Sequence, residues 1–425
     1  MVKKHKVIIV LLVLALILTV GAAAFFWLKI EQFEPEVYYY VPPEISFVYT
    51  SEETAGYGFE EYIKDKIMVE RLRLIKEKKS FVDVDLRSMK LVLYEEGEVF
   101  KIFDIQSKGK EGSWSETAPG AYFVGDKVLK HFSTIARVWM PYAVQFYGNF
   151  FIHGWPYTRS GHDLALGPSG GCIRLLTADA AVVYEFTERG MPVLVFDEKT
   201  SSPLSALLSL DGESVPPELS GNSAMVADLV TGEIVLSKEI HSEFFTDVAA
   251  RGMLALAASE IVSLEKRIIA RSWMTEKVKE GVIVYGRSYR LQDLIGLLLE
   301  RSSQEAALVL SRFVNPEYFL AAMNAKAGAI GMHNTRFVDI TGSSQENITT
   351  LFDMARMMRY IKDYRGFLFD VSSQWSGKGE GNKETVFKIF ETGDRAIFIG
   401  IANSENAQAD LEKIIVWLGN DLGLK

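Results

Sequence analysis

The chain contains a single cysteine, Cys172, in a segment rich in residues that can take part in acyl transfer. A histidine-glycine pair, His153-Gly154, lies upstream of it, and Arg174 follows two residues later. A cysteine nucleophile needs a base to take its proton, a partner that fixes the tautomer of that base, and N–H donors for the oxyanion. The stretch from Ile152 to Leu175 is therefore a candidate site for attack on an amide or an ester, although a lone cysteine is more often a small buried apolar residue.

His153 is the candidate base, provided that the intervening loop folds back to Cys172. No acidic residue is placed by sequence to orient the imidazole, so a backbone carbonyl is the expected partner. The run Pro168 to Gly171 lets the main chain approach closely and turn its N–H groups inward. Arg174 is on the same face of an extended segment as Cys172 and is suited to bidentate binding of a carboxylate. We interpret His162, in the same loop, as a solvated residue.

The elements that must position these residues are short strands. Alternating apolar and acidic residues begin at Phe81, and a Glu96-Gly97 turn between two apolar runs predicts a hairpin. Thr177 is a predicted N-cap for a helix running to about Arg189, with Gly190 at its C-terminal end and a last strand from Pro192 to Phe196. The pattern indicates a β-rich domain with one or two helices.

The segment resembles the signature of the L,D-transpeptidase catalytic (YkuD-type) domain. The matching residues are His153-Gly154 at a strand end and the element Ser169-Gly170-Gly171-Cys172-Ile173-Arg174. A Thr-Pro-x-Gly-x-Phe-like strand of that family is matched loosely by the stretch Thr117 to Tyr122, with its proline one place late. The similarity covers about Lys79 to Glu198.

The resemblance implies that Cys172 is the nucleophile and His153 the base. It also implies that Gly154 lies near the orienting carbonyl, that Gly171 and Cys172 donate to the oxyanion, and that Ser169, with Arg174, contacts substrate. Many family members have a second histidine where this chain has Gly170. The implied reaction is acylation of Cys172 by a peptidoglycan stem peptide at its L,D centre, followed by transfer to an amine of a second stem. No cofactor is implied, and six scattered histidines with one cysteine supply no metal-ligand cluster.

The N-terminus carries a membrane signal. Lys3, Lys4 and Lys6 precede an uncharged apolar run from Val7 to Leu28. As a helix rising about 1.5 Å per residue, this run is long enough to cross a hydrocarbon core of ~30 Å. The lysines place the N-terminus in the cytoplasm and the rest of the chain on the extracytoplasmic side of the cell membrane. The alternative is a cleaved signal peptide, for which the small residues Gly21 to Ala24 would provide the peptidase site.

With 425 residues, the chain is long enough for two or three domains, and its net charge of -9 argues against nucleic acid as a partner. The predicted organisation is a membrane anchor (1–30), a stalk (31–79), the β-rich catalytic domain (80–198), a linker (199–220) and a C-terminal domain (221–425). Helical spacing between Glu60 and Lys79 is compatible with a spacer helix or with packing against the next domain. The oligomeric state is not indicated by the sequence.

The C-terminal region resembles the D-alanyl-D-alanine carboxypeptidase family, with the α/β fold of serine β-lactamases and D,D-peptidases. The resemblance covers about residues 220–420 and rests mainly on the stretch from Met323 to Gly342. Predicted elements include a strand pair, Met225–Val230 and Ile234–Leu236, and helices over Met253–Ser259, Leu291–Leu299 and Ala306–Phe313.

Active members of that family need Ser-x-x-Lys, Ser-x-Asn and Lys-Thr-Gly. In this chain Val248 and Arg251 align with the first serine and lysine, and an arginine cannot become a neutral base. The second motif is reduced to Ser302-Ser303-Gln304, and the nearest string to the third is Glu391-Thr392-Gly393. We expect a catalytically inactive domain, which either binds stem peptides or orients the first domain.

Three functions remain open. The leading hypothesis is a membrane-anchored L,D-transpeptidase that crosslinks peptidoglycan. The second is an L,D-carboxypeptidase or another cysteine amidase, which would use the same chemistry at Cys172 with a different acceptor. The third is a non-enzymatic cell-wall-binding protein, against which the intact set of His153, Cys172 and Arg174 counts.

Overall fold

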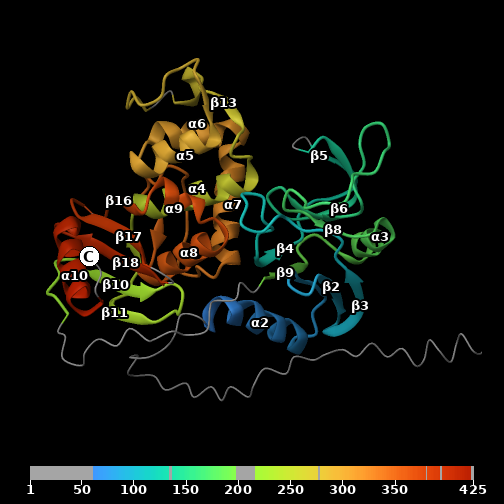
Figure 1. The fold of residues 1–425 in the computed structure, drawn as a ribbon, viewed down its shortest axis with the longest axis horizontal. Helices are drawn as coiled ribbons and strands as arrows, with labels where there is room; N and C mark the ends of the chain where they lie inside the picture. Colours follow the sequence, from blue (N-terminus) through green and yellow to red (C-terminus); the bar gives the residue numbers. More distant parts are fainter. Residues whose placement is uncertain are drawn as a thin grey trace, which may run out of the picture. The chain divides into compact units, whose positions relative to one another are not determined.

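The computed structural model describes residues 61–133, 136–197, 216–275, 278–379, 381–392 and 395–422. Within these ranges, no helix combines the length and the apolar character needed to cross a membrane. The predicted membrane span from Val7 to Leu28 lies outside the described residues, as does the first part of the predicted linker, 199–215. Two domains are described, the first drawn from blue to green in Figure 1 and the second from light green to red.

The first domain contains two β-sheets, of strand order β3-β2-β1-β9-β4 and β5-β6-β7-β8. The pairs β1–β9 and β7–β8 are parallel, and the other neighbouring pairs are antiparallel. The predicted β-rich domain is therefore confirmed. Its strands are β1 (Phe81–Asp85), β2 (Lys90–Glu95), β3 (Glu98–Asp104), β4 (Gly120–Phe123), β5 (Lys127–Ser133), β6 (Val138–Tyr147), β7 (Phe150–His153), β8 (Ile173–Arg174) and β9 (Pro192–Phe196).

Strand β1 is covered on both faces, although apolar and acidic residues alternate along it. Val82 and Val84 belong to the main apolar core of the domain. Asp83 points to the other side, where Arg71 of helix α2 (Glu61–Lys76) pairs with it at 2.6 Å. Beside this ion pair, a second apolar cluster joins Ile67, Leu74, Phe81 and Leu194. Helix α2, in the predicted stalk, therefore packs against the first domain.

Strands β7 and β8, which adjoin the candidate site, are held in place by buried apolar side chains. Ile152 of β7 and Ile173 of β8 are fully buried in the same core as residues of the five-stranded sheet. Helix α3 (Thr177–Phe186) ends earlier than predicted, and Leu176 is its N-cap. The predicted cap at Thr177 is wrong because the Thr177 hydroxyl accepts a hydrogen bond from the Trp155 backbone N–H instead.

The second domain is built around the antiparallel sheet β11-β10-β18-β17-β16. The predicted strand pair and the three predicted helices are confirmed as β10, β11, α4, α5 and α6. The strands are β10 (Ser223–Asp228), β11 (Ile234–Lys238), β12 (Phe244–Phe245), β13 (Arg267–Ile269), β14 (Ser288–Arg290), β15 (Ile348–Thr349), β16 (Gln374–Lys378), β17 (Glu384–Thr392) and β18 (Arg395–Ser404). The helices are α4 (Asp247–Ile261), a 3-10 turn (Ser272–Met274), α5 (Leu291–Glu300), α6 (Gln304–Val314), α7 (Pro316–Ala329), α8 (Leu351–Tyr364), α9 (Phe367–Val371) and α10 (Ala407–Leu422).

Helices cover both faces of this sheet. Alternate residues of β18, such as Ile397 and Ile399, pack with Leu411 and Ile414 of α10. Phe398 points the other way and belongs to the core that includes α4 and α8. The resulting order of layers is helix, sheet, helices, with α4 in the inner layer.

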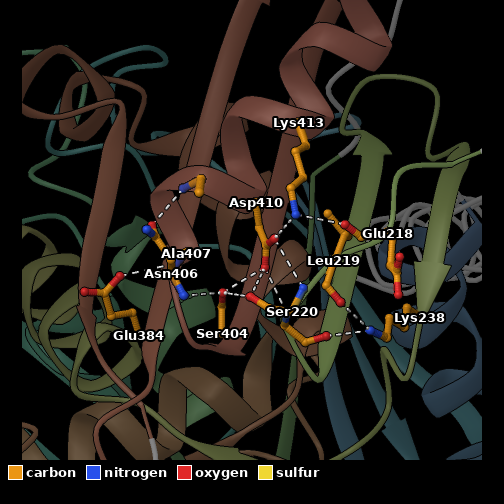
Figure 2. A network of polar contacts seen from close by, with 12 residues as sticks. Glu218, Leu219, Ser220, Lys238, Glu384, Ser404, Asn406, Ala407, Asp410 and Lys413 are labelled. Atoms are coloured by element: carbon orange, nitrogen blue, oxygen red, sulfur yellow. Dashed lines mark hydrogen bonds and ion pairs between the residues drawn. The ribbon is translucent and has the colours of Figure 1, made fainter.

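The start of the second domain is tied to its last helix by a polar network, shown in Figure 2. The Asp410 carboxylate accepts hydrogen bonds from the Ser220 hydroxyl at 2.7 Å, the Gly221 N–H at 2.9 Å and the Ser404 hydroxyl at 2.8 Å. Burial alone would raise the pKa of Asp410, but these hydrogen bonds lower it to about 2. Lys413 adds a hydrogen bond to the Glu218 carbonyl. The network fixes the point at which the chain enters the second domain.

The two domains pack into one compact unit. At their contact lies the buried charge cluster, formed by Glu260, Lys326 and Arg365, whose side chains are all 0% exposed. Lys326 and Arg365 pair with Glu260 at 2.9 and 3.0 Å. The Lys326 ammonium also donates to the Tyr122 hydroxyl of the first domain at 2.8 Å, and Arg365 donates to the Glu116 carbonyl at 3.0 Å. Because an unpaired buried charge is costly, the cluster favours this one arrangement of the domains.

Candidate active site

Strand register places the predicted site residues on one face of the four-stranded sheet. The parallel pair β7–β8 aligns Ile152 with Ile173 and His153 with Arg174. Successive side chains of a strand point to opposite faces, so the two isoleucines enter the core while His153 and Arg174 share the other face. Cys172 directly precedes β8 and lines the same pocket as these two residues.

The Cys172 thiol is held against the start of β7. Its Sγ atom lies 3.6 Å from the Asn149 carbonyl oxygen. Burial raises the pKa of Cys172 to about 11, in spite of opposing effects of the Phe151 backbone and of Arg174. The resting nucleophile is therefore a neutral thiol, which must lose its proton during attack.

His153 is only 2% exposed, and its Nδ1 lies 2.6 Å from the Gly154 carbonyl oxygen. If Nδ1 carries the proton and donates to this carbonyl, Nε2 is left as the basic nitrogen. Burial lowers the pKa of His153 to about 4, so the imidazole is neutral at pH 7. A Cβ at Gly154 would lie 3.0 Å from Pro141 and Thr177, which explains the small residue after the histidine.

The loop before Cys172 is organised by hydroxyl groups. Ser169 accepts a hydrogen bond from the Gly171 N–H at 3.0 Å and donates to the Cys172 carbonyl at 2.5 Å. The Thr117 hydroxyl donates to the Gly171 carbonyl at 2.9 Å. In this conformation the Gly171 N–H, a predicted oxyanion donor, is thus engaged by Ser169. The Ser169 side chain orders the loop, a role that the sequence did not suggest.

Arg174 is buried beneath the same loop. It is 6% exposed, and one of its terminal nitrogens donates to the Gly167 carbonyl at 3.2 Å. Its guanidinium lies 5.8 Å from the centre of the Trp155 ring, and its buried Nε has no hydrogen-bond partner. Burial lowers the pKa of Arg174. The group keeps donor capacity toward the pocket, as carboxylate binding requires.

The pocket around Cys172 has a volume of about 140 Å³ and collects residues that the sequence did not single out. Those from the first domain include Trp114, His131 and Asn149, and those from the second are Glu260 and Ile261 at the end of α4. No local sequence signal could have identified the last two, because they reach the pocket only through the packing of the domains. His162 is exposed and contacts Ser160, in keeping with its interpretation as a solvated residue.

Among the described residues of the second domain, those aligned with the first catalytic motif make other contacts. Val248 is 2% exposed in the first turn of α4. Arg251 pairs with Asp247 at 3.2 Å and donates to the Ser376 carbonyl at 3.0 Å. The position expected for a nucleophile thus carries the apolar isopropyl group of valine, and the position expected for its base carries a fixed cation.

The other two motifs also differ from their active forms. Ser303 is the N-cap of α6 and donates to Glu280 at 2.7 Å. The strand beside α4 is β16, where a Cβ at Gly377 would lie 2.8 Å from Val248 and 2.6 Å from Arg251. Gly377, in the string Trp375-Ser376-Gly377, is therefore close to the two residues aligned with the Ser-x-x-Lys serine and lysine. Glu391, which the sequence suggested for this motif, pairs with Ala396 near the end of β17, and Gly393 lies outside the described residues.

Comparisons with known proteins match the two domains separately. Residues 79–195 match the L,D-transpeptidase catalytic domain (YkuD), and residues 211–385 match the D-alanyl-D-alanine carboxypeptidase family. The chain is 32% identical to a D-alanyl-D-alanine endopeptidase of Escherichia coli over 162 residues, which are 35% of this chain and 49% of that protein. It is 30% identical to a D-alanyl-D-alanine endopeptidase of Pseudomonas aeruginosa over 175 residues, 39% of this chain and 53% of that protein. The chain thus spans about half the length of these curated relatives.

Among solved structures, a D-alanyl-D-alanine carboxypeptidase from Mycobacterium tuberculosis is similar with a TM-score of 0.45 and 18% identity, covering 48% of this chain and 94% of that chain. Penicillin-binding protein 6B from Escherichia coli is similar with a TM-score of 0.43 and 15% identity, and the match covers 49% of this chain and 80% of that chain. The two family matches agree with the division into domains described above. The chain therefore contains an L,D-transpeptidase catalytic domain of the YkuD type, followed by a D-alanyl-D-alanine carboxypeptidase domain.

Proposed function

We propose that the protein is a membrane-anchored cysteine L,D-transpeptidase that crosslinks peptidoglycan stem peptides through an acyl-enzyme at Cys172. The observation that carries the proposal is the shared pocket of Cys172 and His153, with the His153 ring oriented by the Gly154 carbonyl at 2.6 Å. A neutral thiol and a neutral, oriented imidazole that line the same pocket are suited to general-base activation of the nucleophile.

In the first step, Sγ of Cys172 attacks the carbonyl carbon of the donor's L,D amide bond, and the thiol proton passes to Nε2 of His153. The C–N bond breaks, the terminal D-residue leaves as an amine with the proton from His153, and a thioester remains. In the second step, a neutral amine of another stem attacks the thioester carbonyl. Its proton returns through His153 to the sulfur as the C–S bond breaks. The Cys172 N–H is the candidate oxyanion donor in both steps.

Two alternative functions differ from this one in the acceptor, which would be water, or in the domain that carries the activity. With water in the second step, the same site would be an L,D-carboxypeptidase. The relatives named D-alanyl-D-alanine endopeptidase suggest D,D-peptidase activity in the second domain instead. Val248 and Arg251 disfavour this, because they supply neither a serine nucleophile nor a base that can become neutral. A third alternative is a wall-binding protein without activity. The membrane anchor is proposed from the apolar run Val7 to Leu28.

Acylation of the full chain by a carbapenem, followed by mass measurement, tests the assignment of the nucleophile. We expect one covalent adduct in the native protein, none in Cys172→Ala and a much slower reaction in His153→Ala. A penicillin should leave no adduct on residues 220–425. The cysteine-enzyme hypotheses would be contradicted if no carbapenem adduct formed and Cys172 were also inert to thiol reagents. A stable acyl-serine in the second domain would support the D,D-peptidase alternative.

Reaction with a defined tetrapeptide muropeptide then separates the remaining functions. A crosslinked dimer supports the transpeptidase, whereas a trimmed tripeptide supports the carboxypeptidase. Cys172→Ala is the matched control, because its product pattern must equal that of the buffer alone.

A further inference from the structure

A larger groove leads away from the Cys172 pocket along the contact between the two domains. Its volume is about 940 Å³, compared with about 140 Å³ for the pocket itself. The two hollows are adjacent, because His131, Asn149, Phe151 and Ile261 line both. Ligand sites of drug-sized or peptide-sized molecules measure roughly 300–1,000 Å³, so the groove, and not the pocket, has room for a peptide of several residues.

The first domain supplies one wall of this groove and the second domain the other. The first-domain wall includes Asp126, Val128 and Gln145, on or near β5 and β6. The second-domain wall has two parts, the end of α4 and the turn after it (261–266) and the junction of α6 and α7 (313–318). The groove therefore exists only where the two domains meet.

The second-domain wall is held directly against the nucleophile. The Asn149 side-chain amide donates to the Ile261 carbonyl at 2.5 Å, while the Asn149 backbone carbonyl lies 3.6 Å from Sγ of Cys172. A Cβ at Gly148 would lie 2.9 Å from the Ile261 side chain, so this turn fits closely against α4. Glu260, the preceding residue, is fixed in the buried charge cluster. The wall is thus rigidly placed relative to Cys172.

The two ends of the Cys172 pocket offer different chemistry. Arg174 and Ser169 line the pocket but not the groove, so the cation suited to a donor carboxylate lies away from the second domain. The lining of the groove is mixed in charge, with the carboxylates Asp126 and Glu265 and the cations Arg137 and Lys266, and Asp126 pairs with Arg189. Glu265, on the second-domain wall, is therefore the candidate carboxylate for an acceptor amine. Carboxylates attract the ammonium form of an amine, which is the group that an acceptor must bring to the thioester.

We propose that this groove binds the acceptor stem peptide, and that the second domain therefore recognises the acceptor for the first. The proposal rests on the transpeptidase function proposed above. The second domain keeps a peptide-binding task although its own nucleophile position is occupied by valine. Glu265 acts as a specificity residue for the acceptor amine, and the wall around Ser263 shapes the path to Cys172.

The two half-reactions of the full chain test this assignment separately. Acylation of Cys172 by a tetrapeptide donor is followed by mass, and transfer is followed as crosslinked product at increasing acceptor concentration. Ser263→Trp fills the groove, and we expect it to reduce transfer at least about tenfold while acylation stays within about twofold, since only acceptor placement is lost. Glu265→Gln should raise the KM for the acceptor about threefold, the effect of one exposed ion pair. Gln345→Trp, an exposed change elsewhere on the second domain, should alter neither step.

Each result of these measurements either supports or contradicts acceptor binding in the groove. Carbapenem acylation at the native rate shows that Ser263→Trp is folded, and Glu265→Gln is an independent variant that adds no bulk. Unchanged transfer in both variants overturns the acceptor site while leaving the transpeptidase standing. Slower acylation with normal partition of the thioester would assign the groove to the donor instead. If the native protein is never acylated at Cys172, the proposed function itself fails.

Discussion

The Nδ1 atom of His153 lies 2.6 Å from the Gly154 carbonyl oxygen, and the histidine is only 2% exposed. This contact directs the second ring nitrogen toward general-base work without an acidic partner. The pKa values of Cys172 and His153 distinguish two possible resting states of the site, an ion pair and a neutral pair. A preformed thiolate-imidazolium pair would require a lowered thiol pKa, whereas burial raises the pKa of Cys172 to about 11 and lowers that of His153 to about 4.

The first prediction concerns the reactivity of the thiol with pH. Alkylation by iodoacetamide at pH 7.5 should be about a hundredfold slower in the native chain than in the chain unfolded by guanidinium, because each pH unit below the pKa costs tenfold in thiolate. The native rate should rise tenfold per pH unit up to about pH 10. Since Cys172 is the only cysteine, the label reports this site alone. An inflection between pH 5 and 8 in the native chain would reveal a thiolate-imidazolium pair instead.

The pH dependence of acylation follows from the same two groups. The competent form has His153 neutral and Cys172 protonated, so carbapenem acylation should remain on a plateau above about pH 4 and below about pH 11. Protonation of the imidazole removes the base, and the rate should fall only as the pH approaches 4.

The local features of the first domain could be predicted because they depend on short-range patterns. Alternation at Val82 and Val84 indicated a strand, and the spacing of Cys172 and Arg174 indicated a shared face. The structure has both. The cap at Thr177 was mispredicted because residue type alone does not show that its hydroxyl is used by the Trp155 N–H.

The rest of the site depends on contacts between distant residues. Ile261 reaches the pocket from 112 positions beyond Asn149 in the chain, through a hydrogen bond that no sequence pattern announces. The approach of Gly377 on β16 to Val248 and Arg251 likewise could not be found from string similarity. Engagement of the Gly171 N–H by Ser169 depends on the conformation of the loop, which the residue types alone do not specify.

The third prediction concerns the loop before the nucleophile. Gly171 has a φ of +107°, and a Cβ there would lie 2.2 Å from the Phe150 ring. Gly171→Ala should lower the free energy of unfolding by about 3 kcal/mol, because backbone strain and overpacking add. Urea unfolding of the full chain measures this loss.

The matched control for Gly171→Ala is the same substitution at the neighbouring Gly170. A Cβ at Gly170 would meet nothing within 4 Å, so Gly170→Ala should change the free energy of unfolding by less than about 0.5 kcal/mol. Equal unfolding midpoints for the two variants would show that the loop relaxes around the added methyl group.

The last prediction concerns the buried charge cluster that joins the domains. Burial lowers the pKa of Lys326 to about 8 against the opposing attraction of Glu260, and both side chains are 0% exposed. Lys326→Met should destabilise the chain by about 3 kcal/mol, because it removes one partner of a buried carboxylate. Adding Glu260→Gln should lower the stability further, because it leaves the buried Arg365 guanidinium without the carboxylate that it pairs with at 3.0 Å. The added loss should be smaller than that of Glu260→Gln alone, because the Lys326 ammonium is no longer there to be left unpaired. Lys362→Met on α8, whose ammonium lies 3.6 Å from Asp363 at the surface, should cost no more than about 1 kcal/mol. Urea unfolding of these three variants and of Glu260→Gln alone distinguishes a buried electrostatic contact from general sensitivity to lysine loss. A double variant whose loss equals the sum of the two single losses would contradict coupling between Glu260 and Lys326.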